Sequence, residues 1–286
     1  MDRPTSPAPR SLVHLAFAAI AALAAGCSGT ASGGAGDAPA DPLADPYGSG
    51  KRVHELVGPA TWSNPDDRDS VSCKVPANVQ VHITGATVIA VDRFDETGDG
   101  ALGNIYVQDS LDDRPPYSGV TVFAPSFAPP DLHLSAGDVA DLIGDYQEFL
   151  GPVSGPFSFC HTLPEMGGAM TFRFDTRPVA PKTIPITDLR SYDTARKWLG
   201  SLIRVENVTL VSDATPDSKK RCNVPIDVGG GISQGDQPKI SNELFDLDCA
   251  AGTKLTAGTK LKSITGVLTY FYSFNIAPRS ADDVVL

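Results

Sequence analysis

Apolar and polar residues alternate with a period of two in a series of short stretches beyond residue 70. Alternation that is rich in β-branched residues is typical of half-buried β-strands, and turn-forming residues fill the gaps between these stretches. The glycine in the middle of the first stretch, Gly85, predicts a bulge or a sharp bend. The first half of the chain contains five predicted strands, at 79–91, 104–109, 119–124, 138–150 and 157–163.

The second half repeats this order of strands. The block "VHITGATVI" from Val81 matches "IRVENVTLV" from Ile203, and "LSAG" at 134–137 matches "LTAG" at 255–258. Two matches in the same order at nearly one offset indicate a duplicated unit. We expect "LSAG" and "LTAG" to form the turn before the fourth strand of each unit, with the Ile and Gly that follow packed inside. The second unit contains five predicted strands, at 201–213, 223–229, 239–245, 261–271 and 273–278.

Between the two units, the apolar spacing changes to that of a helix over "ITDLRSYDTARKWLGSL" (186–202). The spacing predicts one amphipathic helix, with Thr187 or Asp188 as its N-cap. Its basic residues are predicted to form a solvated face and are Arg190, Arg196 and Lys197. Its apolar residues are predicted to face the core and are Leu189, Tyr192, Ala195, Trp198 and Leu199.

The N-terminus has the pattern of an export signal. Arg3 and Arg10 precede an apolar run over 12–25, which is shorter than the roughly 20 residues that a spanning helix needs. The run ends in "LAAGC", which resembles the bacterial lipobox, in which the cysteine becomes the acylated first residue. The resemblance implies that residues 1–27 are a lipoprotein signal peptide and that Cys27 carries the lipid; ordinary secretion with cleavage nearby is the alternative. Ser28 stands where some bacterial lipoproteins have a retention aspartate, which favours the outer membrane.

Composition divides the rest of the chain. Residues 28–70 are rich in Gly, Ala, Pro, Ser and Asp, which is typical of a disordered, flexible tether. The two strand-rich units then predict domains at 71–185 and 186–286. The net charge is −11, with 6 basic and 14 acidic residues over 72–185 against 12 and 12 over 186–286. Because nucleic-acid affinity depends on clustered cations, the acidic charge disfavours DNA or RNA as a partner of the first unit.

Four cysteines besides Cys27 remain in this exported chain. They are read first as two disulfides, for which three pairings are possible. If each unit is its own domain, the economical pairing joins Cys73 to Cys160 and Cys222 to Cys249. A zinc site lacks the Cys-x-x-Cys or paired histidine spacing that would support it.

The complete order of motifs resembles a known family. "NIYVQD", "YSGVTVF", "LIRVENVTL" and the terminal "ITGVLTYFYSFNIAPRSADDVV" look like the OB-fold modules of bacterial secreted and surface proteins, which are found in tandem or attached to extracellular nucleases. The fold expected from pattern and resemblance is mainly β, with two five-stranded Greek-key OB-like barrels in tandem joined by a short helix. The resemblance implies a ligand surface on the second and third strands and the loops beside them.

The second unit offers the better candidate surface for such a ligand. Stacking aromatics interleaved with basic residues are what single-stranded nucleic acids require. In the first unit, Tyr106 and Phe123 lie on the predicted second and third strands, among acidic neighbours. The candidate surface of the second unit is Lys219, Lys220, Arg221, Tyr270 and Tyr272. The alternative is that these aromatics pack in the core and the charges are only solvated.

Two other chemistries have weaker signals. The loop "DRFDETGDG" contains Asp92, Asp95 and Asp99 and partly matches the start of a calcium-binding loop, but it lacks the glutamate that closes one. A solvated acidic turn is the alternative. The histidines are scattered, no nucleophile or metalloprotease motif is present, and His82 and His161 are expected to be structural. No catalytic residue and no cofactor are therefore predicted.

These observations predict a non-catalytic, membrane-anchored surface lipoprotein. Its partners would be the membrane, through the lipid, and an unknown ligand or envelope protein that binds the barrels. One alternative is an accessory protein for extracellular nucleic-acid or phosphoester binding or breakdown. Another is a calcium-stabilised adhesion or envelope-structure module.

Overall fold

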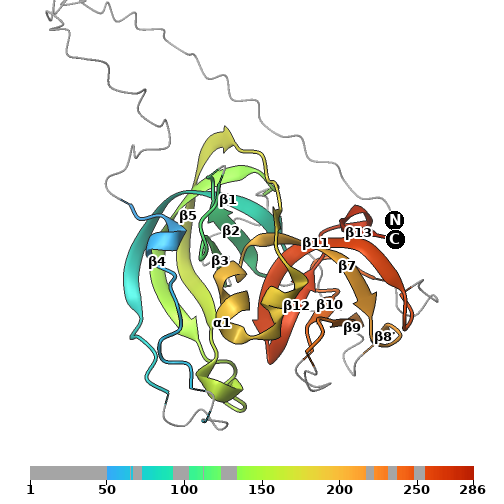
Figure 1. Cartoon of the computed structure of the whole chain (residues 1–286). Coiled ribbons are helices and arrows are strands. Elements are labelled where there is room, and N and C mark those ends of the chain that lie inside the picture. Colours follow the sequence, from blue (N-terminus) through green and yellow to red (C-terminus); the bar gives the residue numbers. More distant parts are fainter. Residues whose placement is uncertain are drawn as a thin grey trace, which may run out of the picture. The chain divides into compact units, whose positions relative to one another are not determined.

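The structure is a computed structural model, and it describes most of the chain beyond residue 49 (Figure 1). The predicted signal peptide, Cys27 and the first part of the predicted tether lie outside the described residues. Among the residues that are described, no helix is long and apolar enough to cross a bilayer. The described residues are 50–64, 66, 73–92, 103–111, 113–123, 134–216, 222–230, 237–247 and 255–286.

The first unit is a closed barrel with the strand order β1-β2-β3-β5-β4. β1 pairs antiparallel with both β2 and β4, and the ring closes through a parallel pair between β3 and β5. This closed Greek-key arrangement confirms the predicted OB-like architecture. The strands, blue-green to yellow in Figure 1, are β1 (Val79–Val91), β2 (Ile105–Asp109), β3 (Gly119–Val122), β4 (Asp138–Phe149) and β5 (Leu163–Thr176).

β1 bends where the sequence predicts. Its register against β4 shifts between Ile83 and Ala86, and Gly85 between them has a φ of +64°. The bend lets one long strand pair with β4 along its first part and with β2 along its second part. Ile83, Ala86 and Val88 all point into the core of the barrel.

The fifth strand of this barrel is not where the sequence predicts it. Residues 157–163 form a loop with a 3-10 turn at Ser158–Cys160, and β5 begins only at Leu163. The segment "LPEMGGAMTFRFDT" contains a proline, a glutamate and two adjacent glycines, all of which are depleted in strands. β5 forms nevertheless because β4 pairs with it from Phe149 back to Asp138.

The second unit is also a closed five-stranded barrel. β7 pairs with β9 and β11, β10 pairs with β9 and β12, and β11 pairs with β12, so the ring follows the order of the first barrel. Short strands β6 (Lys182–Thr183), β8 (Thr215–Pro216) and β13 (Val284–Val285) extend this sheet. The ring strands, orange to red in Figure 1, are β7 (Leu202–Leu210), β9 (Cys222–Asp227), β10 (Lys239–Ser241), β11 (Lys260–Phe271) and β12 (Ser273–Ala277).

The repeated "LSAG" and "LTAG" form equivalent turns before β4 and β11, as predicted. Gly137 and Gly258 have φ values of +104° and +77°, which glycine adopts without steric cost. Each donates its N–H to the first strand of its own barrel, at Val88 in one and Leu210 in the other. The prediction that the following isoleucine packs inside is correct for one copy only, because Ile143 is 54% exposed.

The predicted continuous helix between the barrels is broken into three short turns. A 3-10 turn at Ile186–Arg190 is followed by α1 (Tyr192–Ala195) and by a second 3-10 turn at Arg196–Trp198. Ser191 interrupts the helix with extended backbone angles, and its side chain accepts the N–H of Thr194 as the N-cap of α1. Capping by Ser191, rather than by Thr187 or Asp188, thus starts the one short α-helix of the described chain.

The segment 50–57, assigned by composition to the tether, is folded against the first barrel. Lys51 pairs with Ile83 in a parallel bridge, and a 3-10 turn follows at Val53–Glu55. Val53 and Val57 are buried in the core of the barrel. The predicted domain start at residue 71 is therefore too late, because a few apolar residues suffice to fix a segment whose average composition is that of a linker.

The barrels touch through a small apolar cluster of their own. Ile89, Ala90 and Tyr106 of the first barrel are packed with Leu202 and Val267 of the second. The loop after β4 adds a further contact, since Phe157 is fully buried in the core of the second barrel. The described barrels are thus joined by packed side chains as well as by the connecting segment.

Candidate functional site

The outer face of β2 and β3, where the resemblance places a ligand in the first barrel, is covered by the second barrel. The Gln108 side chain accepts the backbone N–H of Leu202 at 3.1 Å. Gly119 lies so close to Gly200 and Ser201 that a Cβ atom would be 2.3 Å from the Gly200 carbonyl carbon. A ligand therefore cannot occupy this face while the two barrels are in contact.

Tyr106 contributes to the same contact. Its hydroxyl donates to the Glu243 carboxylate, and the second Glu243 oxygen accepts the Thr269 hydroxyl at 3.1 Å. Burial, followed by the negative charge of Glu243, raises the pKa of the Tyr106 phenol well above its ordinary value. The phenol thus remains a donor, and Tyr106 cannot serve as a stacking platform because it is buried.

The equivalent surface of the second barrel carries a row of polar side chains. Lys239 pairs with Asn275, and Ser241 pairs with Asn223. Neighbours paired across a sheet share one side, and the alternate residues Val224, Ile240, Leu268 and Ile276 are in the core. The polar row therefore lies on the outer side of the sheet, where Ser241, Thr269 and Asn275 are buried and Asn223 and Lys239 are half-buried. We call it the polar face, and its residues are Asn223, Lys239, Ser241, Thr269 and Asn275.

Ser241 gives the polar face an unmet hydrogen-bonding group. Its side chain is only 7% exposed, and within the described part of the chain its hydroxyl has no hydrogen-bond partner. A buried hydroxyl without a partner costs about 1–3 kcal/mol, so native proteins satisfy most such groups. A ligand group or a water on the polar face would remove this cost.

The predicted site residues of the second barrel are separated by burial. Tyr270 is 6% exposed and packs against Phe157, Tyr192 and Phe274, so its assignment to a binding surface was wrong. Alternation of β11 turns it inward. Tyr272, in the turn between β11 and β12, is exposed. Lys219, Lys220 and Arg221 lie outside the described residues.

The calcium prediction falls mostly on residues that the structure does not describe. Asp95 and Asp99 are outside the described residues, whereas Asp92 ends the strand region of β1 and donates its N–H to the Asn104 carbonyl at 2.8 Å. Elsewhere in the described ranges, no group of three potential ligands is close enough to hold a metal ion.

The structure joins Cys73 to Cys160 in a disulfide, with their Cα atoms 5.4 Å apart, which is the pairing that the sequence favours. Cys222 is also disulfide-bonded. Cys249, its expected partner, lies outside the described residues.

A buried arginine forms the main polar contact between the barrels, where the sequence predicts a solvated one. Arg196 is 1% exposed, and its Nη2 donates to Glu148 of β4 at 2.7 Å. The other nitrogens donate to the hydroxyls of Tyr192 and Thr162 and to the Gly58 carbonyl. Helical spacing placed Arg196 on the outside, but the helix is broken before it, which turns the side chain inward.

Electrostatics keep this cluster charged and fully bonded. Burial alone would lower the pKa of Arg196, but Tyr192 and Glu148 outweigh it and hold the pKa above its ordinary value. Burial, followed by Glu148, raises the pKa of Tyr146 far above its ordinary value, so its hydroxyl donates to Glu148. The cluster thus holds an ion pair with hydrogen bonds on both members, which is the form in which a buried pair is tolerated.

Two histidines of the described chain make close side-chain contacts. His161 stacks on Tyr192 with ring centroids 3.9 Å apart, and its Nδ1 is 2.8 Å from the Tyr270 hydroxyl. His54 Nδ1 is 2.6 Å from the Asp109 carboxylate, which also accepts the N–H groups of Val53 and His54. Among the hydrogen bonds of the described residues, none joins His54 to a serine, threonine or cysteine. Asp109 therefore fixes segment 50–57 to the barrel.

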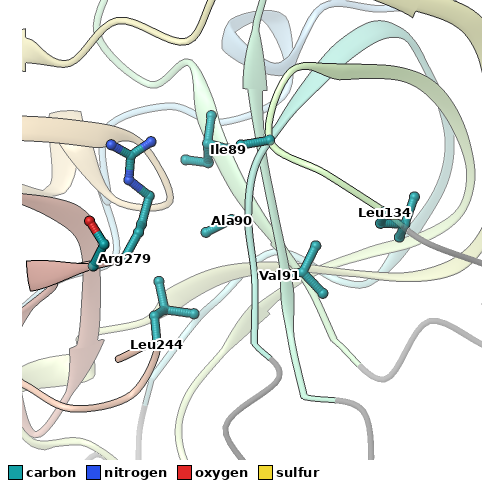
Figure 2. A pocket seen from close by; sticks show the side chains of 8 residues that line it. Ile89, Ala90, Val91, Leu134, Leu244 and Arg279 are labelled. Carbon is teal, nitrogen blue, oxygen red and sulfur yellow. The ribbon is translucent and has the colours of Figure 1, made fainter. Parts of the chain in front are cut away.

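A small open pocket of about 260 Å³ lies at the seam between the barrels (Figure 2). Ile89, Ala90 and Val91 line it from β1, and Leu244 and Arg279 line it from the second barrel. The Arg279 guanidinium makes two hydrogen bonds to Asp283, which balance its charge. The pocket thus has an apolar wall and a neutralised cation, without a group aimed at a specific ligand.

Glu165 is a buried carboxyl on the outer side of β5. It pairs with Thr121 of β3 and with Gln147 of β4, whose amide donates to it at a long 3.4 Å. Burial raises the pKa of Glu165 to about 7, and the Gln147 hydrogen bond offsets this only in part. The folded protein therefore keeps a proton that the unfolded chain loses near its ordinary pKa of 4.5.

This shift predicts a pH-dependent loss of stability. The stabilising contribution of Glu165 to the free energy of unfolding is fully present below pH 4.5 and is lost as pH rises through about 7. Glu165→Gln removes the ionisation, so we expect the variant to gain about 2–3 kcal/mol over wild type between pH 5 and pH 8. Urea unfolding at both pH values measures this, with Glu206→Gln on the exposed side of β7 as the control. Parallel pH profiles for wild type and Glu165→Gln would contradict the assignment.

A scan against protein-family models and searches of curated proteins and of solved structures find no match to this chain. The polar face presents amides and hydroxyls, which donate and accept hydrogen bonds, and one ammonium, which donates them.

Proposed function

We propose that this chain is a non-catalytic, lipid-anchored envelope protein whose second barrel presents a binding surface for a ligand or another envelope protein. The lipobox-like "LAAGC", with Cys27 as the acylated residue, supports the anchor. The tether-like composition that follows supports a folded part held away from the lipid. The proposed outer-membrane location rests on Ser28, which stands where some bacterial lipoproteins have a retention aspartate.

The observation that carries the binding proposal is the contrast between the two equivalent faces. The face of the first barrel is closed by Leu202, Gly200 and Ser201. The polar face of the second barrel includes Ser241, a buried hydroxyl with an unmet hydrogen bond. The face of the second barrel is mostly buried but leaves Asn223 and Lys239 half-buried, which suits a protein in which the first barrel supports and the second barrel binds.

The runner-up, an accessory in nucleic-acid binding or breakdown, has less support. Two of its stacking candidates, Tyr106 and Tyr270, are buried, although Tyr272 and Phe123 remain exposed. Lys239 is the one cation of the polar face, whereas phosphate binding calls for several. The calcium-stabilised module remains a prediction about residues outside the described part.

The binding proposal is tested by photocrosslinking in cells that produce the full chain. A photoreactive amino acid replaces the half-buried Asn223 on the polar face or, as a control, the exposed Thr171 on β5 of the first barrel. We expect a discrete adduct from position 223 and none from position 171. Lys239→Glu should weaken the adduct roughly tenfold if one charge-assisted contact is lost. The same adducts from both positions, or none from position 223, would rule out the polar face.

A further inference from the structure

An apolar tip stands out on the second barrel. It consists of Val153, which is fully exposed, and of Phe271 and Tyr272, each 46% exposed. Exposed apolar side chains are ordinary when they are single, but a group of them indicates a contact surface. The group combines the loop after β4 with the turn between β11 and β12.

The tip is built on a rigid base. Gly155 donates to the Pro152 carbonyl and so closes a turn with Val153 at its centre, and the Tyr272 hydroxyl donates to the Gly155 carbonyl. Behind the tip, the Phe157 ring meets Phe271 and Tyr272 edge-on, with centroids 5.8 and 5.2 Å apart. The exposed side chains are therefore held in place before any partner arrives, which lowers the entropic cost of binding.

Tyr272 has a backbone conformation that is unusual for an aromatic residue. Phe271 pairs with Ser273, so Tyr272 alone makes the turn, and its φ is +61°. Glycine or asparagine adopts this conformation more readily than a bulky aromatic residue does. A strained residue that the fold retains is grounds for seeking a role for its side chain, which here points to the exposed aromatic ring.

The tip also differs from the rest of the chain in charge. The chain has a net charge of −11, yet no Asp, Glu, Lys or Arg occurs over 149–164 or over 263–278, the two stretches that build the tip. A bilayer surface repels an acidic protein but accepts uncharged aromatic and aliphatic groups. Tyrosine is enriched at the level of the headgroups, where its ring and hydroxyl meet both environments.

We propose that Val153, Phe271 and Tyr272 insert into the interfacial layer of a lipid bilayer. The contact goes beyond the proposed function, because it needs no acyl chain and involves a surface separate from the polar face. It would fix the orientation of the second barrel relative to the membrane, which a flexible tether alone cannot do. Burial of two half-exposed aromatic rings corresponds to roughly 10- to 30-fold tighter partitioning into vesicles.

The test places a tryptophan at the tip of the full chain. Phe271→Trp is compared with Ile143→Trp, a similarly exposed site on the first barrel, in phosphatidylcholine vesicles with or without brominated acyl chains. Trp62 and Trp198 give the same background in both variants. We expect brominated lipid to quench the emission of Phe271→Trp and to leave that of Ile143→Trp near background. Equal quenching of the two variants, or none of either, would overturn the proposal.

A second variant separates insertion from folding. Val153→Asp changes a fully exposed side chain, so the protein should keep its melting temperature while quenching in the Phe271→Trp background falls several-fold, since a charge at the tip opposes insertion. Unchanged quenching would contradict insertion of the tip. Flotation of this tip variant with the vesicles reports the Cys27 anchor separately, because its tip no longer inserts. Its failure would count against the proposed anchor and leave the quenching comparison valid.

Discussion

Arg196→Met is expected to lower the free energy of unfolding by about 3–5 kcal/mol, because it leaves Glu148 buried without its cation. The Glu148 side chain is 3% exposed and would keep only the hydroxyls of Tyr146 and Thr162 as donors. The methionine would also lose the Gly58 carbonyl contact that ties the N-terminal segment to the connecting segment. Urea unfolding followed by circular dichroism measures the loss.

Lys197→Met is the matched control, since Lys197 is the next residue and its side chain is only half-buried. Its effect should stay within about 0.5 kcal/mol. The double variant Arg196→Met with Glu148→Gln should be more stable than the sum of the single effects predicts, because the uncompensated charge is gone. Additive losses, or a loss no larger than that of Lys197→Met, would show that the ion pair does not hold the barrels together.

Removal of the disulfide between Cys73 and Cys160 is the second large effect. Their separation of 87 residues encloses most of the first barrel, so in the chain-entropy model the bond stabilises the fold by roughly 4–5 kcal/mol. It also anchors the loop that carries Phe157 into the second core. We expect Cys73→Ser with Cys160→Ser to unfold at lower urea concentration under non-reducing conditions.

Complete reduction of both proteins is the control for this comparison. It removes every disulfide, including that of Cys222, so the serine variant and wild type should then unfold at nearly the same urea concentration. Equal stability without reductant would mean that the bond constrains the unfolded chain far less than its loop length implies.

Local patterns in the sequence predicted most strands because half-buried strands alternate with a period of two. They also predicted the turns at Gly137 and Gly258, where the repeated sequences "LSAG" and "LTAG" each place a glycine at a position with a positive φ. The sequence did not predict β5, because the stability of this strand comes from pairing with β4 rather than from its own residues. The sequence also did not predict that the segment around Val53 and Val57 is folded, because a few apolar residues inside a polar stretch leave its average composition unchanged.

The site was harder to predict, because exposure depends on what other elements cover. Alternation puts Tyr106 and Gln108 on the outside of their barrel, and only the fold shows that the second barrel lies over them. The same alternation should have placed Tyr270 inside, since its neighbours Thr269 and Phe271 occupy the outer side. The signal for the closed face was Gly119, a glycine in a strand, which marks a close approach of another backbone.

The central claim is that the second barrel closes the first barrel's β2–β3 face, whereas the polar face of the second barrel can be reached at the half-buried Asn223 and Lys239. Cysteines on the outer sides of the two faces, Gln108→Cys and Asn223→Cys, test it most directly through peptide-resolved alkylation of the folded protein. The account predicts that Asn223→Cys reacts at least roughly a hundredfold faster than Gln108→Cys, and that denaturant equalises the rates. Equal rates in the folded protein would show that the first face is as open as the second.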